Sequence, residues 1–122
     1  MFRGFLFYIM FEKIYQILTV FLGESKQGEY TKECENYQFN CPCCKEYNGN
    51  IEDNKYNLEV LLSPTKGLKF HCWKCSETDG MKGNLSYLVK RYGGRNLYLS
   101  YKEELSAIKA ANLYNIPNFD EI

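Results

Sequence analysis

The chain has 122 residues, the size of one ordinary domain, and this length excludes a large catalytic fold. Its 45% hydrophobic and 25% charged residues are typical of a globular protein, and the 16% aromatic share is high for so small a chain. Fifteen basic side chains balance fifteen acidic ones, so only a local patch could attract a nucleic acid or an anionic membrane.

The first 22 residues are rich in Phe, Ile and Leu. Charges at Arg3, Glu12 and Lys13 interrupt this run, which argues against a membrane span, and no small-residue cleavage pattern follows, which argues against a signal peptide. We expect no membrane partner, and Met10 is an alternative start. Helical spacing predicts a helix over one side of a sheet, within a segment 1–36 that ends in a polar loop, from Phe11, Ile14, Tyr15, Leu18, Phe21 and Leu22.

Six cysteines indicate either disulfides in an oxidising compartment or a metal site in a reducing one. Cys41 and Cys44 form one C-x2-C pair, and Cys72 and Cys75 form a second after 27 intervening residues. Each tight turn offers two sulfurs to one cation at about 2.3 Å, so two turns complete a tetrahedral shell. We predict one structural zinc ion on these four cysteines. A rubredoxin-like iron site, disulfides and free thiols are the alternatives.

A closed shell of four cysteines has no open coordination position, so the ion should not activate water. Cys43 lies between the first two ligands and is expected to be a bystander, and Cys34 is expected to be a free thiol. Because a zinc–thiolate site favours a reducing environment, we expect a cytoplasmic protein.

Short strands are predicted around the cysteine pairs. Residues 37–40 lead into the first pair, 55–62 is a β-like run, SPTKG at 63–67 is a turn, and 68–72 is the returning strand. The result is a zinc-ribbon domain over 37–95, with an antiparallel sheet of about three strands. So small a sheet depends on the metal for much of its folding free energy.

Two helices are predicted after the second pair. Asn84 can cap a helix over 85–92 that Gly93 and Gly94 end. Ser100 and Glu103 form a capping box for a helix that continues toward Pro117, within a segment 96–122 of helix and tail. The predicted class is therefore α+β, a small zinc-ribbon antiparallel sheet with packed N- and C-terminal helices.

The charge is distributed unevenly along the chain. Residues 1–63 carry a net charge of −3, residues 64–95 carry +5 and residues 96–122 carry −2. A solvated face is one interpretation; the other is a nucleic-acid surface, in which cations meet phosphates and rings stack on unpaired bases. The structural alternatives are that Trp73 packs on the fold and that His71 is a half-exposed strand residue turned away from the metal. The candidate residues are Lys66, Lys69, His71, Trp73, Lys74, Arg91 and Arg95.

Three segments carry a family resemblance: FNCPCC at 39–44, KFHCWKC at 69–75 and GNLSYLVKRYG at 83–93. Together they resemble the amino-terminal zinc-binding domain of bacterial and bacteriophage DNA primases. That family has the same order of strand, cysteine pair, strand, aromatic-flanked second pair and Gly-Asn helix start. The resemblance covers about residues 37–95, near half of the chain; paired C-x2-C turns alone occur in many zinc ribbons.

The resemblance implies a module of DNA replication that binds single-stranded template DNA where an RNA primer begins. It implies as partners a primase catalytic domain or subunit and a replicative helicase, in a bacterial cell or a phage-infected host. The family's catalytic domain holds magnesium on clustered acidic residues, whereas the late acidic residues here belong to a helix start and a tail. We therefore expect this chain alone to be non-catalytic. A zinc ribbon that binds protein in a replication or transcription assembly is the alternative, ahead of a rubredoxin-like electron carrier.

Overall fold

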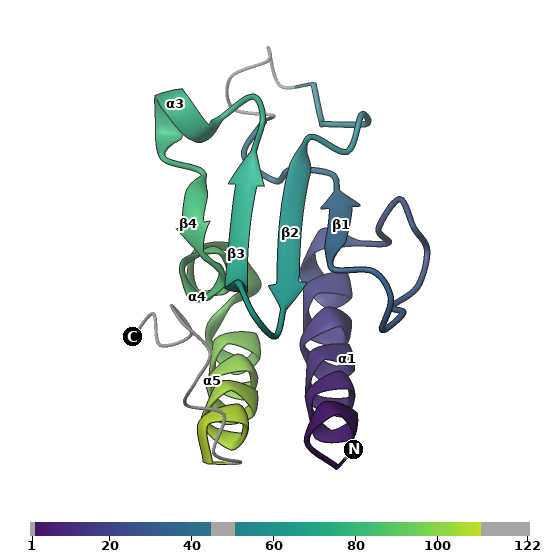
Figure 1. Cartoon of the computed structure of the whole chain (residues 1–122). Coiled ribbons are helices and arrows are strands. Elements are labelled where there is room, and N and C mark those ends of the chain that lie inside the picture. The colour runs from purple at the N-terminus through teal and green to yellow at the C-terminus, as the bar shows by residue number, and fades with distance from the viewer. Residues whose placement is uncertain (1, 45–50, 111–122) are drawn as a thin grey trace.

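A four-stranded antiparallel sheet forms the centre of the fold (Figure 1). The computed structural model describes residues 2–44 and 51–110. The strands pair in chain order and are β1 (Asn36–Phe39), β2 (Leu58–Ser63), β3 (Gly67–Cys72) and β4 (Lys82–Asn84). Two long helices, α1 (Phe2–Leu22) and α5 (Arg95–Ala110), accompany the sheet. The predicted α+β class with N- and C-terminal helices is confirmed.

The two faces of the sheet differ in burial. On the outer face, Glu59 of β2 pairs with His71 of β3 and Leu61 pairs with Lys69, and all four side chains are half-buried. The alternate residues point inward to the core, as the pleat of a strand requires. These buried residues are Leu58, Val60, Leu62, Leu68, Phe70 and Cys72. The outer face of the central strands is thereby left accessible.

The long helices supply the other half of the core. They run side by side in opposite directions (Figure 1), and both contribute to the same buried cluster. The predicted apolar stripe of the N-terminal helix is confirmed, with its last two residues only half-buried. Within the described part of the chain, no helix has an apolar run long enough to cross a membrane. The main buried side chains are Phe11, Ile14 and Leu18 of α1 and Tyr101, Leu105 and Ile108 of α5.

The polar segment after α1 is a loop, as predicted, and it covers the free edge of β1. Lys26 N donates to Gln38 O (2.7 Å), and Gln38 N donates to Gln27 Oε1 (3.1 Å). A buried Ser25 anchors the loop through its 2.8 Å hydrogen bond with the hydroxyl of Tyr15. Because the loop satisfies these backbone groups, β1 does not present an open template for strand pairing.

The structure differs from prediction in the number of strands. β4 is a fourth strand, and its register pairs Lys82 with His71 and Asn84 with Lys69. Its three residues carry no apolar alternation, so only backbone pairing with β3 identifies them as a strand. Asn84 precedes the next helix, as predicted, but its side chain makes no capping bond; its Oδ1 instead accepts from Lys69 Nζ (2.9 Å).

The boundaries of the helices after β4 also differ from those predicted from the sequence. The predicted helix over 85–92 is present as α4 (Leu85–Leu88), followed by one π-helical turn, η1 (Val89–Gly93). The second helix begins at Arg95, so the predicted start at Ser100 is wrong. Gly94 alone separates η1 from α5, and its φ of 87° is positive, a conformation that glycine readily adopts. Ser100 lies exposed inside α5. The continuation toward Pro117 lies outside the described residues.

Replacing Leu105 with alanine should lower the free energy of unfolding by about 2–5 kcal/mol, because a buried leucine loses its contacts and leaves a cavity. Leu105 is 1% exposed, whereas the adjacent Ser106 is exposed. Ser106→Ala is therefore the matched control and should change stability by less than about 0.5 kcal/mol. Denaturant unfolding measures both variants. Equal stabilities for the two would contradict the packing of α5 on the core.

Candidate metal centre and the neighbouring basic surface

The two predicted cysteine pairs meet at one end of the sheet, beyond β1 and β3. The Sγ atoms of Cys41, Cys44, Cys72 and Cys75 all lie within 4.8 Å of one another, and all four residues are buried. Cys44 Sγ lies 3.7 Å from Cys72 Sγ and 3.5 Å from Cys75 Sγ. A tetrahedral shell with bonds of about 2.3 Å separates its sulfurs by about 3.8 Å, whereas a disulfide separates them by about 2.05 Å. The cluster therefore fits a metal ion, and all four are free cysteines.

Backbone N–H groups point at the sulfurs in both turns. Cys43 N donates to Cys41 Sγ (3.3 Å), and Lys74 N donates to Cys72 Sγ (3.4 Å) in the same relative position. Cys75 N makes a further 3.4 Å contact with Cys72 Sγ. Hydrogen bonds of this kind stabilise the negative charge of a thiolate. Both turns are thus built to present thiolates to a shared cation.

The four cysteines of the cluster differ in the pKa of their thiols. A hydrogen bond with Cys41, together with the N–H groups of Cys75 and Lys74, lowers the pKa of Cys72 to about 5. The hydrogen bond with Cys72 and burial raise the pKa of Cys41, and burial raises the pKa values of Cys44 and Cys75. A bound cation requires deprotonated sulfurs, so its binding releases protons and weakens in acid.

A carboxylate that the sequence did not reveal holds the first turn in place. Asp53 Oδ2 accepts from the backbone N–H groups of Cys41 (2.8 Å) and Asn57 (2.9 Å), and Oδ1 accepts from Lys55 N (2.9 Å). The carbonyl of Asn57 accepts from Trp73 N (2.9 Å), so the same loop contacts both turns. The only sequence signal for Asp53 was an aspartate in a polar loop, a common turn residue.

Cys43 lies outside the four-sulfur cluster, as expected of a bystander, but it is fully buried and has a partner. Its Sγ donates to Asp79 Oδ2 (2.9 Å), at the end of the short helix α3 (Ser76–Asp79). The same carboxylate pairs with the guanidinium of Arg91. Cys43, Asp79 and Arg91 therefore link the first turn, α3 and η1. Arg91, a predicted phosphate contact, already has an internal partner.

The exposed Trp73 and the half-buried His71 form a ring pair beside the cluster. The rings meet nearly edge-on, with centroids 4.4 Å apart and planes at 71°. Trp73 is 67% exposed, so most of its side chain is accessible although its ring touches His71 of β3. His71 points away from the cysteines, as predicted, onto the outer face of β3, where a hollow of about 140 Å³ also involves Glu59 and Lys69. Its buried Nδ1 has no hydrogen-bond partner among the described residues.

The other predicted nucleic-acid residues are more dispersed. Lys69 lies on the outer face near His71, and Lys74 is exposed in the second turn next to Trp73. Lys66 is exposed in the β2–β3 turn, at the opposite end of β3. A strand of this length separates it from Trp73 by roughly 20 Å. Arg95 is exposed at the start of α5. The structure thus groups Lys69, His71, Trp73 and Lys74, and leaves Lys66 and Arg95 apart.

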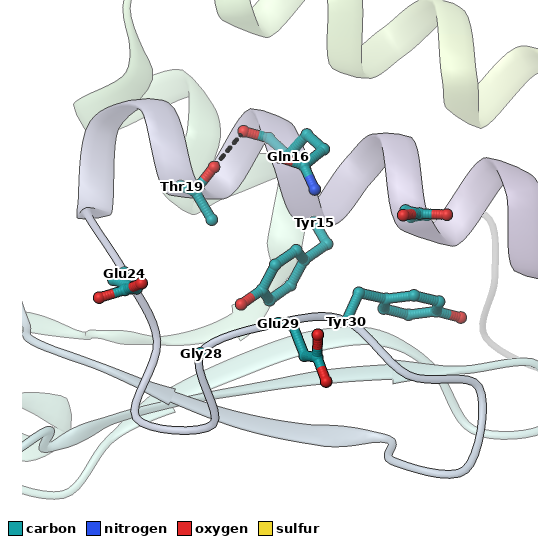
Figure 2. A pocket seen from close by; sticks show the side chains of 8 residues that line it. Tyr15, Gln16, Thr19, Glu24, Gly28, Glu29 and Tyr30 are labelled. Carbon is teal, nitrogen blue, oxygen red and sulfur yellow. Dashed lines mark hydrogen bonds between the residues drawn. The ribbon is translucent and has the colours of Figure 1, made fainter.

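An acidic hollow of about 390 Å³ lies between α1 and the loop that covers the edge of β1 (Figure 2). Three carboxylates and no lysine or arginine line it. This edge of the sheet is far from β4 in the strand order. The carboxylates of this hollow and the basic residues of β3 and β4 therefore lie in different parts of the fold, although the net charge of the whole chain is zero. The lining residues are Glu12, Tyr15, Gln16, Thr19, Glu24, Gly28, Glu29 and Tyr30.

Comparisons with family models, curated proteins and solved structures found no match for this chain.

Cys72→Ser should abolish metal retention, because a closed shell loses one of its four thiolates. The wild type should retain one ion per chain after dialysis. Cys34→Ser is the matched control, since the Cys34 thiol lies outside the cluster and donates to Asn36 O (3.0 Å). Elemental analysis gives both the identity and the amount of the metal. One full equivalent on Cys72→Ser would refute the site.

Asp53→Ala should lower metal affinity by about 10–100-fold, because groups that orient metal ligands have effects of this size. The substitution removes the acceptor for Cys41 N while leaving all four sulfurs in the chain. Glu52→Ala, at an exposed neighbouring position, is the control and should bind as the wild type does. Competition with a chelator of known affinity measures each variant. Equal affinities for Asp53→Ala and the wild type would show that Asp53 does not position the turn.

Proposed function

We propose that this chain is a zinc-binding module that binds single-stranded template DNA within a priming apparatus. One observation carries the proposal: the ring pair of exposed Trp73 and half-buried His71 adjoins the turn that contributes Cys72 and Cys75 to the sulfur cluster. Any ion held by the cluster would therefore fix this ring pair relative to the sheet. A fixed aromatic surface stacks on bases with little loss of side-chain entropy on binding.

The chemistry of the four ligands supports zinc in a structural role. All four are thiolate donors, and none is more than 4% exposed, so the shell is closed to water. Zinc readily accepts four thiolates in tetrahedral geometry, and such sites stabilise the fold outright. Iron is the alternative that elemental analysis distinguishes from zinc.

The surroundings of the ring pair favour an unpaired nucleic-acid strand. Lys69, Lys74 and Lys82 supply positive charge on or beside the same part of the sheet, and the last of these pairs in register with His71. Ammonium groups meet phosphates while aromatic faces meet bases, which is the general pattern of single-strand binding. A duplex conceals the faces of its bases within the stack, so a stacking surface favours a single strand.

The order of elements supports the proposed relationship to primase zinc domains. β1 leads to the first cysteine pair, β2 and β3 lead to the second, and α4 follows. As in that family, primer synthesis would need a separate catalytic domain or subunit, and a replicative helicase is a further proposed partner. A protein-binding zinc ribbon is the second candidate, because exposed tryptophan is also typical of protein interfaces.

Trp73→Ala should weaken single-stranded DNA binding by about 1–3 kcal/mol, the usual loss when one stacking ring is removed. Val20→Ala, at a 69% exposed position on α1, is the control and should bind as the wild type does. Fluorescence anisotropy with a labelled oligonucleotide at low and moderate salt measures all three proteins. Wild-type affinity should fall steeply with salt. Absence of wild-type binding at low salt would overturn the proposal and favour the protein-binding candidate.

A further inference from the structure

Two lysines from different elements flank one tyrosine on the side of the fold that holds η1 and α5. Lys90 Nζ of η1 and Lys102 Nζ of α5 each lie 5.9 Å from the centroid of the Tyr98 ring. Lys90 is exposed, and Lys102 and Tyr98 are half-buried. Neither lysine forms an ion pair with any residue that the structure describes. This cluster, the Lys90–Tyr98–Lys102 surface, therefore combines uncompensated positive charge with an aromatic ring.

The helical periodicity of α5 extends the charge beyond this cluster. Arg95, Tyr98, Lys102 and Lys109 recur at intervals of three, four and seven residues and so share one side of the helix. The core-facing positions Tyr101, Leu105 and Ile108 lie next to this side. The exposed Glu103 and half-buried Glu104 fall on other sides of the helix at 100° per residue. One flank of α5 is therefore basic along its length.

We infer that the Lys90–Tyr98–Lys102 surface is a second binding surface for the phosphate backbone of the same single-stranded DNA. This inference rests on the proposed function. The strand would contact Trp73 and His71 with its bases and reach η1 and α5 with its backbone. Charge complementarity supports this occupant, because two ammonium groups with no ion-pair partner among the described residues gain favourable interactions with phosphates and release the strand's condensed cations. The ring of Tyr98, which lies between the two lysines, offers a contact to a base or a sugar of the strand.

The charge of the remaining fold supports the same assignment. β3, β4, η1 and the start of α5 belong to the segment with a net charge of +5, whereas the acidic hollow lies between α1 and the loop at β1. An anionic strand is thus attracted to β4, η1 and α5, whereas the three carboxylates of the acidic hollow offer it no counterion. An acidic peptide would satisfy the lysines equally, but the ring pair on the outer face favours a partner with stacking bases.

The test compares the double variant Lys90→Gln/Lys102→Gln with the wild type and with Lys13→Gln, which removes an exposed lysine from α1. Anisotropy titrations use labelled single-stranded DNA of about 20 and about 5 nucleotides, lengths above and near the smallest single-strand sites. For the longer strand, the double variant should bind about five- to tenfold more weakly, as expected for two exposed charge contacts. Its slope of log affinity against log salt should decrease in magnitude by about 1.4, since each lost single-strand phosphate contact contributes about 0.7. Lys13→Gln should match the wild type.

The shorter strand distinguishes this inference from the proposed function. It should bind the double variant and the wild type equally, because it occupies only the ring pair. Wild-type-like binding of both strands by the double variant would overturn the second surface and leave the proposed function intact. Absence of wild-type binding to either strand would overturn both. Inorganic phosphate or an acidic peptide would be the ligand of this surface if it bound the wild type but not the double variant while both proteins bound DNA equally. That result would overturn the inference.

Discussion

Four cysteine sulfurs in a space less than 5 Å across are the constraint on which this structure depends. Four thiolates at such distances would repel one another in a buried environment, so the deprotonated form of the cluster calls for a cation. Two segments of the chain, separated by β2 and β3, must therefore remain side by side. The backbone N–H groups aimed at Cys41 and Cys72 prepare the sulfurs for this charge. The positions of the Asp53 loop and of Trp73, which adjoin the two cysteine turns, follow from the way in which these turns are held together.

Stabilisation of the turns extends outward through two carboxylates. Asp53 accepts hydrogen bonds from the first turn, and Asp79 links Cys43 to Arg91 across α3 and η1. The second turn carries Trp73, whose backbone N–H donates to the same loop that holds Asp53. Hydrogen bonds of this kind orient metal ligands and the residues beside them. The backbone of Trp73 is thus held by the sulfur cluster on one side and by the loop of Asp53 on the other, although its ring remains exposed.

Local patterns in the sequence predicted the parts of the molecule that local chemistry determines. The spacing of the four cysteines, the β-like run at 55–62 and the turn at Ser63, whose Oγ accepts from Lys66 N (3.0 Å), depend on residues close together in the chain. Asp53 and β4 depend on partners that are distant in sequence. Asp53 meets an N–H group twelve residues away, and Lys82 pairs with His71 by backbone alone. The capping box at Ser100 was misleading because Gly94 already allows a helix to begin at Arg95.

The balance of fifteen basic and fifteen acidic side chains conceals an uneven distribution along the chain, with a net charge of +5 on residues 64–95 and −3 on residues 1–63. Three carboxylates line the hollow between α1 and the loop at the edge of β1, whereas one group of basic residues lies on β3, β4, η1 and one flank of α5. Net charge governs solubility and bulk attraction, whereas the local field governs how an anion approaches. A neutral protein with this polarity would not hold nucleic acid over its whole surface. It would instead attract an anionic chain to the side that carries the basic residues.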